Sequence, residues 1–553
     1  MNDLAVEFLR GHPRWLDGTQ PEVPDLVTLR QRWLRDGATT LLNQLGGSFA
    51  LGLRDPASGA QLLAVDRFAR ETLCWRVRDG QLVSAEQAAT LGQSGELDPQ
   101  ALFDYLYFHC IPAPRTVYRA IQRLPAGHAL HWDGRQARVE PFWRPEFHPE
   151  AQPDFGSLKQ AFRGALEQSV QRALDGGVPA CFLSGGTDSS TVAGMVQRVS
   201  GRGEAFSIGF ESEGYDEMAY AKVAAEHFGL RHHAYYVTPK DLLDALPQVA
   251  ASFDQPFGNS SALPSFFCAR MARRAGARRV LAGDGGDELF GGNSRYAQGR
   301  VFAHYARVPH WLRRGLLEPL FESALIRQTP GLKKGSSYIS QAKAGMPARL
   351  ERYNLIHQLG LQQVLTPAML GQVDAQAPAA LQQAVWQQGL AADELNTHLA
   401  FDWRFTLADN DLVKVRGACA LAEIEVAFPL LDDAVLALSQ RLPLDYKLRG
   451  ERLRWFFKEA LADFLPPAVI TKTKHGFGLP FGPWLAHEPA LQAMSRELMH
   501  SLASRGLLRA DFIDRLLKDY LPQHPGYYGE MVWIALSLEL WLQAHAPSFR
   551  LPQ

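Results

Sequence analysis

One glycine-rich segment has the residue types needed to hold a phosphate. Its sequence is Ser184-Gly-Gly-Thr-Asp188-Ser-Ser190. The glycines let backbone N–H groups approach an anion closely, and the serines add hydroxyl donors. Asp188 would repel a phosphate unless a divalent cation lay between them, so we interpret it as a Mg²⁺ ligand. No lysine follows the glycines, unlike in the mononucleotide loop. The alternative is an ordinary strand-to-helix turn built from small residues.

A second glycine-rich segment concentrates acidic residues. Gly283-Asp284-Gly-Gly-Asp287-Glu288 places three carboxylates within five residues, and close carboxylates repel one another unless a cation relieves them. If this segment lies beside the first one, Asp287 can complete a Mg²⁺ shell with Asp188 while Asp284 faces the reacting centre. The alternative is a solvated acidic turn.

Short apolar strands followed by helices position both segments. Residues 178–183, 205–210 and 279–282 have the pattern of buried strands, and helices are expected between them. This alternation predicts an α/β fold with a parallel sheet and ligands at the carboxyl ends of its strands. Residues from about 297 onward are expected to be mainly helical. Residues 1–150 instead show short strands broken by turns, followed by a polar linker at 145–154.

Composition describes a soluble globular protein. The 553 residues carry a net charge of -1, which gives no indication of nucleic-acid or membrane partners. Five scattered cysteines without metal spacing favour reduced thiols, and we expect a cytoplasmic location because no signal peptide or membrane span is evident. The apolar stretch 531–542 is expected to be a packed C-terminal helix.

The glycine-rich segments resemble a known family. Ser184 to Ser190 resembles the SGGxDS pyrophosphate loop of the ATP pyrophosphatases, which cleave ATP to AMP and pyrophosphate. Together with the strand at 206–210, the block Asp254-Gln-Pro-Phe-Gly-Asn and the loop at 283–292, it resembles the synthetase domain of class B, glutamine-dependent asparagine synthetases. Blocks at 410–432 and 472–480 continue the resemblance. It implies an adenine-nucleotide α-hydrolase-like (PP-loop) fold with a helical C-terminal part.

The resemblance implies a role for each residue of the candidate site. Asp188 and Asp287 would bind Mg²⁺, and Asp284 and Lys474 would be catalytic, with Lys474 neutralising pyrophosphate; outside this context Lys474 would be a solvated lysine. The adenine is expected near Leu183, Ile208 and Gly283. The residues expected to bind ATP or its pyrophosphate are Leu183, Ser184, Gly185, Gly186, Thr187, Asp188, Ser189, Ser190, Ile208 and Gly283.

The N-terminal part resembles the glutaminase domain of the same family, which has an Ntn-type β-sandwich. The matching stretches include GSFALGLRD at 47–55 and LLAVDRF at 62–68. Asn2 stands where such glutaminases have a nucleophilic cysteine, and the RGPD and NGEIYN motifs are absent. We therefore expect a degenerate domain at 1–150 without glutaminase activity, followed by a synthetase domain at 155–553. This layout resembles β-lactam and carbapenam synthetases and lasso-peptide cyclases.

A further departure from the family falls in its acceptor region. Arg416 replaces an acid, and Gly417 and Ala427 replace arginines. These changes indicate either a repacked surface or a changed carboxylate or amine substrate. Asp284 matches the acidic position of asparagine synthetases, where the lactam-forming enzymes carry tyrosine, so a β-lactam product is disfavoured.

These observations predict an ATP-dependent ligase that adenylates a carboxylate and transfers it to an amine. The substrates would be a small-molecule or peptide carboxylate and an amine, with ATP and Mg²⁺ as cosubstrate and cofactor. A homodimer, a precursor peptide and a pathway protein are further candidate partners. Specialised metabolism is favoured, and the alternatives are a macrolactam peptide cyclase, an ammonia-dependent asparagine synthetase and a catalytically dead scaffold. A neutral chain without a basic stripe disfavours a tRNA-modifying enzyme.

Overall fold

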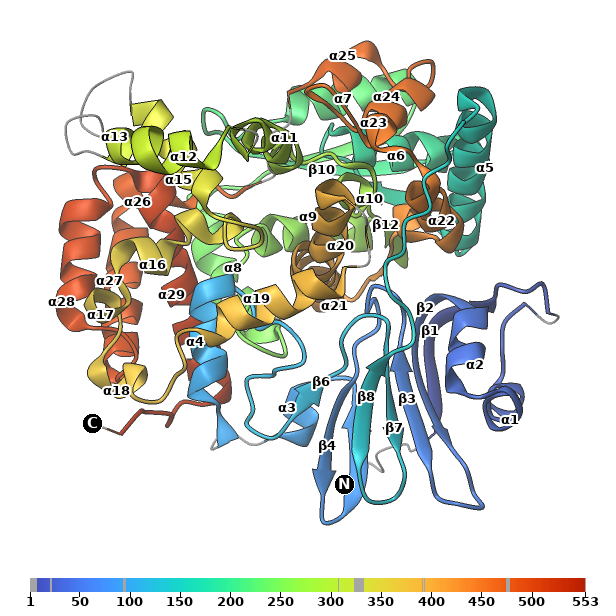
Figure 1. Cartoon of the computed structure of the whole chain (residues 1–553), viewed down its shortest axis with the longest axis horizontal. Helices are drawn as coiled ribbons and strands as arrows, with labels where there is room; N and C mark the ends of the chain where they lie inside the picture. Colours follow the sequence, from blue (N-terminus) through green and yellow to red (C-terminus); the bar gives the residue numbers. More distant parts are fainter. Residues whose placement is uncertain are drawn as a thin grey trace.

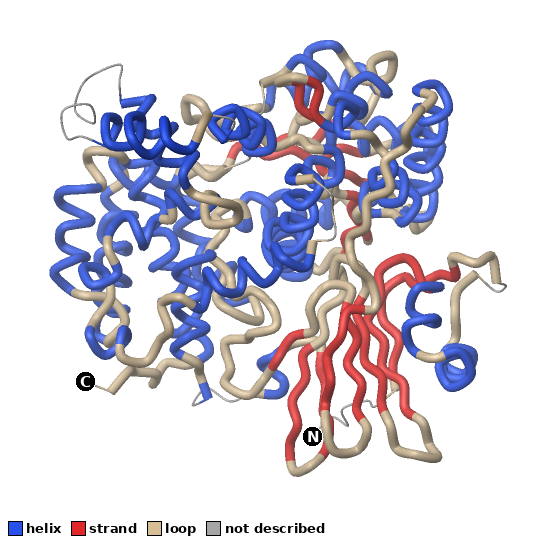
Figure 2. The backbone as a smooth tube through the Cα atoms, in the orientation of Figure 1, coloured by secondary structure: helices blue, strands red, loops and turns tan. Residues whose placement is uncertain are grey.

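The structure is a computed structural model with a mixed α/β fold (Figure 1). It describes residues 7–19, 22–92, 96–306, 308–322, 333–389, 391, 393–473 and 478–552. Antiparallel strands form the N-terminal part, a parallel sheet lies near the middle of the sequence, and helices make up most of the remainder (Figure 2).

The N-terminal part contains two antiparallel sheets. Leu41, Phe49 and Leu51 belong to a core between the larger sheet and helices α1 and α2, and Ala50 and Leu63 belong to a second core shared with the smaller sheet. Alternate residues of one strand thus enter opposite cores. The larger sheet has the order β1-β2-β3-β7-β8 and the smaller β5-β4-β6. The elements are β1 Phe8–Trp15, α1 Leu26–Asp36, α2 Ala38–Gln44, β2 Leu45–Arg54, β3 Gln61–Val65, β4 Cys74–Arg78, β5 Gln81–Ala85, β6 Gln122–Arg123, β7 His128–Trp132 and β8 Ala137–Pro141.

The central sheet has five parallel strands in the order β11-β10-β9-β12-β13. Helices α6, α7, α9 and α21 pack against it. The expected parallel sheet is therefore present, with two strands that the sequence pattern did not indicate, β11 and β13. The elements are α5 Phe155–Ala173, β9 Ala180–Phe182, α6 Thr187–Ser200, β10 Glu204–Gly209, α7 Met218–Phe228, β11 Arg231–Tyr236, α8 Pro239–Ser252, α9 Ala262–Arg274, β12 Arg279–Leu281, α21 Leu412–Leu421 and β13 Glu425–Ala427.

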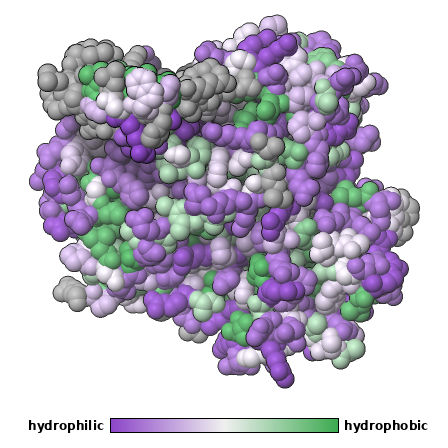
Figure 3. Space-filling view, viewed as in Figure 1, coloured by the Kyte–Doolittle hydropathy of each residue, from purple (hydrophilic) through white to green (hydrophobic). Residues whose placement is uncertain are grey.

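The C-terminal part is mainly helical, as expected. Its last long helix, α29 (Pro525–His545), is enclosed by other elements, and the residues from Met531 to Leu542 are all buried. This confirms the packed helix expected there. Among the described residues, no helix is both long and apolar enough to span a membrane. Hydrophilic residues predominate on the face shown in Figure 3.

The N-terminal and C-terminal parts interlock through helix α4 (Pro99–Phe108). Asp98 caps this helix by accepting a hydrogen bond from Gln100 N at 3.0 Å, as the Asp-Pro pair predicts. The hydroxyl of Tyr105 donates to Ile534 O of α29 at 2.8 Å, so α4 packs among the C-terminal helices (Figure 1). The division of the chain near residue 150 stays a prediction.

Candidate active site

The first glycine-rich segment forms a tight turn between β9 and α6. Gly185 has φ +70°, and a Cβ there would lie 2.5 Å from Ala221 N, so both conformation and space require glycine. The Ser184 and Ser189 hydroxyl oxygens lie 3.0 Å apart and fix the turn. No side chain caps α6 at Gly186. An uncapped helix N-terminus presents backbone N–H groups and partial positive charge, which suit a phosphate.

The second glycine-rich segment joins β12 to the short helix α10 (Gly286–Phe290) and lies directly against the first. A Cβ at Gly283 would be 2.7 Å from Ser189 N, and a Cβ at Gly286 would be 2.5 Å from Asp188 Oδ1. These contacts arise because β9 and β12 are neighbouring parallel strands, whose carboxyl ends meet at one edge of the sheet. The structure thus brings the two glycine-rich segments together.

Asp188 and Asp287 converge on a single positive charge. Arg454 Nη1 lies 2.7 Å from both carboxylate oxygens of Asp188 and 2.8 Å from Asp287 Oδ1. The Arg454 side chain is 7% exposed, and its backbone is left-handed, with φ 43°. Such a conformation is strained for a non-glycine residue, so strong contacts must hold it. Asp188 and Asp287 therefore form a site that holds a positively charged group.

Asp284 lies beside a lysine. Its Oδ1 is 3.8 Å from Lys414 Nζ, which is also 2.9 Å from Asp411 Oδ1. Burial raises the pKa of Asp284 to about 6, while the charge of Lys414 opposes the rise. A carboxyl group with this pKa can accept a proton near neutral pH.

A cavity of about 420 Å³ opens where these loops meet. Ten of the predicted site residues line it: Leu183, Ser184, Gly186, Thr187, Asp188, Ser189, Ile208, Gly283, Asp284 and Asp287. Ser190 is fully buried, and neither it nor Gly185 lines the cavity. Lys474 lies outside the described residues, so the structure gives no position for it.

Three cations that line this cavity are not among the predicted site residues: Lys414, Arg454 and Lys472. Lys472 Nζ is 2.7 Å from Glu217 Oε1 and lies over the Tyr220 ring, and its side chain is 7% exposed. Its position two residues before Lys474, within a block already singled out, could have drawn attention to it. Arg454 gave no local signal. Arg454 and Lys472 both pair with carboxylates that line the same cavity.

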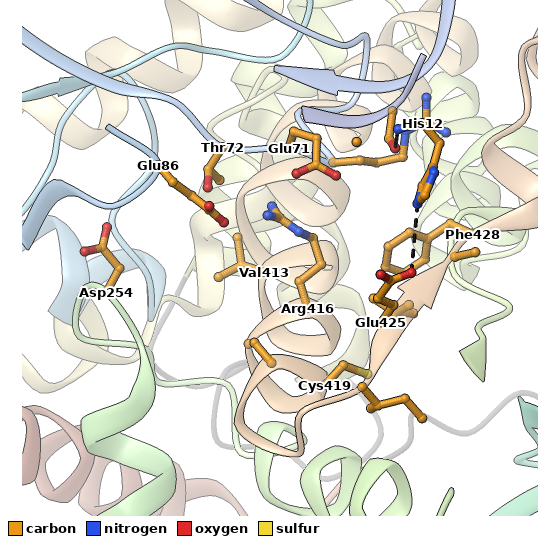
Figure 4. Close-up of a pocket in the computed structure, with 18 of the residues that line it drawn as sticks. His12, Glu71, Thr72, Glu86, Asp254, Val413, Arg416, Cys419, Glu425 and Phe428 are labelled. Carbon is orange, nitrogen blue, oxygen red and sulfur yellow. Dashed lines mark hydrogen bonds and ion pairs between the residues drawn. The ribbon is translucent and has the colours of Figure 1, made fainter. Parts of the chain in front are cut away.

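The positions that depart from the family pattern line a different cavity. Arg416, Gly417 and Ala427 belong to the wall of a cavity of about 590 Å³ between the N-terminal part and helix α21. Figure 4 shows Arg416 pointing toward Glu71 and Glu86 of the N-terminal part. Among the described residues, this cavity shares no lining residue with the nucleotide-sized one. These departures therefore lie where the two parts of the chain face each other, and their effect on packing or on the substrate stays a prediction.

Comparison with known families agrees with the geometry. The asparagine synthase model matches residues 161–543, which is more than half of the chain, and a glutamine amidotransferase domain model matches residues 24–143. The chain belongs to the asparagine synthase family. This membership supports an ATP-dependent ligase that forms amide bonds.

Individual relatives of the chain are named as asparagine synthetases. A putative asparagine synthetase (glutamine-hydrolyzing) of Mycobacterium tuberculosis is 29% identical over 465 residues, covering 81% of this chain and 69% of the relative. Asparagine synthetase (glutamine-hydrolyzing) 1 of Bacillus subtilis is 23% identical over 510 residues, covering 90% and 78%. Putative asparagine synthetase (glutamine-hydrolyzing) 2 of Methanocaldococcus jannaschii is 31% identical over 229 residues, covering 40% and 44%.

Proposed function

We propose that this chain is an AMP-forming amide ligase that adenylates a carboxylate with ATP and transfers the acyl group to an amine. The observation that carries the proposal is the meeting of two glycine-rich loops around one cavity. An uncapped helix N-terminus, the cations Arg454 and Lys472, and the carboxylates Asp188 and Asp287 all face that cavity. This set suits a nucleotide triphosphate bound with a divalent cation.

Asp188 and Asp287 would hold Mg²⁺. The fit rests on their donor set: two carboxylates already share one cation, the Arg454 guanidinium. Mg²⁺ is commonly bound by one or two carboxylates and completes its shell with phosphate oxygens and water. When bound, it would neutralise negative charge on the ATP phosphates.

Two steps follow from the residues around the cavity. In the first, a carboxylate oxygen of the substrate forms a bond to the α-phosphorus and the bond to the pyrophosphate breaks. The loop from Ser184 to Ser189, together with Arg454 and Lys472, stabilises the departing pyrophosphate, and we assign the same role to Lys474. In the second, the amine attacks the acyl carbon and AMP leaves. Asp284 accepts the proton that the amine loses.

We further propose that the chain does not hydrolyse glutamine. All five cysteines are buried, and three of them, Cys74, Cys110 and Cys419, line the cavity between the two parts of the chain. Burial raises the pKa of each of these three thiols above its usual range. Because the thiolate is the nucleophilic form, none of the three is suited to attack an amide. The amine must then arrive as ammonia or as part of a substrate.

The test is ATP–pyrophosphate exchange and AMP release by the purified protein with MgATP and a carboxylate. We expect Asp188→Asn to lower exchange at least about 100-fold, because it removes charge from the cation position. Asp244→Asn removes a carboxylate from an exposed pair with Lys240 and should leave exchange unchanged. Full exchange in the Asp188 variant would contradict the proposal.

The choice of amine separates the competing functions in the same assay. Turnover with aspartate and ammonium, but not glutamine, would identify an ammonia-dependent asparagine synthetase. Release of glutamate from glutamine would contradict the absence of glutaminase activity. AMP formation without an added amine, with a product that has lost one water relative to the carboxylate substrate, would identify a cyclase. Failure to bind MgATP would identify a scaffold.

A further inference from the structure

Arg454 takes the position between the two carboxylates that would hold Mg²⁺. Its Nη1 atom lies 2.7 Å from both carboxylate oxygens of Asp188 and 2.8 Å from Oδ1 of Asp287. The side chain of Arg454 is 7% exposed, and those of Asp188 and Asp287 are 17% and 16% exposed, so solvent screens the attraction only weakly. A guanidinium at this point and a divalent cation would use the same carboxylate oxygens.

The backbone of Arg454 is anchored beside the second glycine-rich segment. Arg454 follows the hairpin strand β15 (Arg452–Leu453) and precedes helix α24 (Trp455–Ala460). Its N–H donates to Gly291 O at 3.1 Å, directly after the helix α10 that carries Asp287. The left-handed backbone of Arg454, with φ 43°, is of the kind found at ligand clamps and switch regions. The guanidinium can therefore leave the carboxylates by side-chain rotation while the backbone stays in place.

Helix α24 gives this anchor a rigid base. Phe456 and Phe457 are fully buried, and their ring centroids lie 5.6 and 5.3 Å from that of Phe162 in α5. Phe457 also contacts Phe290 of α10, with centroids 5.2 Å apart. Because α10 and α24 share one core, the carboxylate of the first and the guanidinium before the second are held at a fixed separation.

We infer that Arg454 competes with the divalent cation for Asp188 and Asp287, so that the cation binds weakly alone and tightly together with the nucleotide. The inference rests on the proposed function, because the phosphates of ATP would give the guanidinium a second anionic partner. Without a phosphate, metal binding would leave a buried guanidinium unpaired, which is costly. Arg454 is thus a positioning residue that couples metal binding to nucleotide binding.

The alternative is that Arg454 only holds the two loops in place. A purely structural arginine would support the binding of metal and of nucleotide alike, so its removal would weaken both. Competition predicts opposite effects: removal of the guanidinium strengthens binding of the metal alone and weakens binding of the nucleotide alone. The signs of the two changes therefore separate the two roles.

Four variants suit this test. Arg454→Asn removes the charge, and asparagine adopts a left-handed backbone more readily than most residues. Arg454→Gly serves if the first variant fails to fold, since glycine tolerates that backbone best. Arg454→Lys keeps a positive charge. Arg452→Met is the matched control, because Arg452 lies in the same hairpin, is 66% exposed and pairs with Glu459 on the surface.

Electron paramagnetic resonance would measure binding of Mn²⁺ without nucleotide, and calorimetry would measure binding of ATP in the presence of a chelator. We expect Arg454→Asn to bind Mn²⁺ at least about tenfold more tightly than wild type, and ATP at least about tenfold more weakly. Arg454→Lys should bind Mn²⁺ as weakly as wild type, and Arg452→Met should match wild type in both measurements. Adding Asp188→Asn to Arg454→Asn should remove the gain in Mn²⁺ binding.

Three outcomes would overturn the inference: Arg454→Asn binds Mn²⁺ no more tightly than wild type, the gain survives the added Asp188→Asn, or ATP binding is unchanged. The proposed function is tested separately, by ATP–pyrophosphate exchange in the wild type. Opposite changes in Mn²⁺ and ATP binding, without exchange for any carboxylate, would overturn adenylation and leave the competition standing. Exchange in the wild type, with unchanged Mn²⁺ binding in Arg454→Asn, would do the reverse.

Discussion

Asp284 shows how one residue's environment sets its chemistry. Because burial raises the pKa of this carboxyl to about 6, the amide-forming rate should rise with pH through about 6 and then level off. Asp284→Asn should lower that rate by about 10²- to 10⁴-fold and remove the rise. Pyrophosphate exchange should persist, since it precedes amine attack. Single-turnover product formation across pH 5 to 8 would measure this, and an unchanged pH profile would exclude Asp284 as the base.

The raised pKa of Asp284 also predicts an effect on the free energy of unfolding. The folded-state pKa of Asp284 lies above the ordinary value of 3.8, so the folded state binds more protons between these pH values and stability falls as pH rises through them. Asp284→Asn should remove this loss and stabilise the protein at pH 7.5 by up to about 3 kcal/mol. Urea unfolding at pH 4 and 7.5 would show the gain mainly at the higher pH.

Individual residues of the site were predictable from the sequence to different degrees. Asp188 and Asp287 lie within short glycine-rich segments, where residue type alone indicates phosphate and cation chemistry. Arg454 lies 266 positions from Asp188, in a segment with no such pattern. Its role depends on a tertiary contact, which local sequence does not encode.

At the scale of elements, the two loops act as one unit because they touch. A Cβ at Gly286 would lie 2.5 Å from Asp188 Oδ1. We therefore expect Gly286→Ala to displace Asp188 and weaken MgATP binding at least about tenfold, with a stability cost of about 1–3 kcal/mol from overpacking. AMP lacks the β- and γ-phosphates, so its affinity should change little. Calorimetry with both nucleotides would measure the difference.

Gly164→Ala is the control for the loop variant, since a Cβ there meets nothing within 4 Å. It should bind both nucleotides normally and be slightly more stable, because alanine is the better helix former. Equal loss of MgATP and AMP binding in Gly286→Ala would mean general disruption of the cavity. If Gly286→Ala lost neither MgATP binding nor AMP binding, the close contact between the two loops would not matter for nucleotide binding.

Elements were predictable where their local pattern is strong. Strands β2, β3 and β7 have apolar residues bounded by turn signals, and Asp98-Pro99 marks the start of α4; all four elements are present. Strand β11, with the sequence Arg-His-His-Ala-Tyr-Tyr, lies at the sheet edge and is largely exposed. Its sequence therefore lacks the apolar run that indicates a buried strand. The three-residue strand β13 is too short to be read from periodicity.

At the scale of the molecule, Asp433 connects the N-terminal part to the rest of the chain through hydrogen bonds. Its carboxylate accepts hydrogen bonds from Gly47 N at 2.8 Å, Arg67 at 2.9 Å and Arg14 at 2.8 Å, and it is 11% exposed. Burial alone would raise the pKa of Asp433, but the charges of Arg67 and Arg70 hold it below its usual value. One core cluster runs through both parts, including Phe68. We therefore expect the chain to unfold in one transition.

Asp433→Asn should destabilise the whole chain by about 3–5 kcal/mol, because the buried Arg67 guanidinium would lose its charged partner. Since the folded-state pKa is lowered, the stabilisation is present above the ordinary value of 3.8 and is lost as pH falls below it. The difference in unfolding free energy between wild type and Asp433→Asn should therefore narrow at low pH.

The control is Asp511→Asn, which alters a surface pair with Arg509 and should not change the free energy of unfolding measurably. Urea unfolding followed by tryptophan fluorescence would test both variants. A separate early transition in Asp433→Asn would show that the two parts unfold independently, contrary to the shared core.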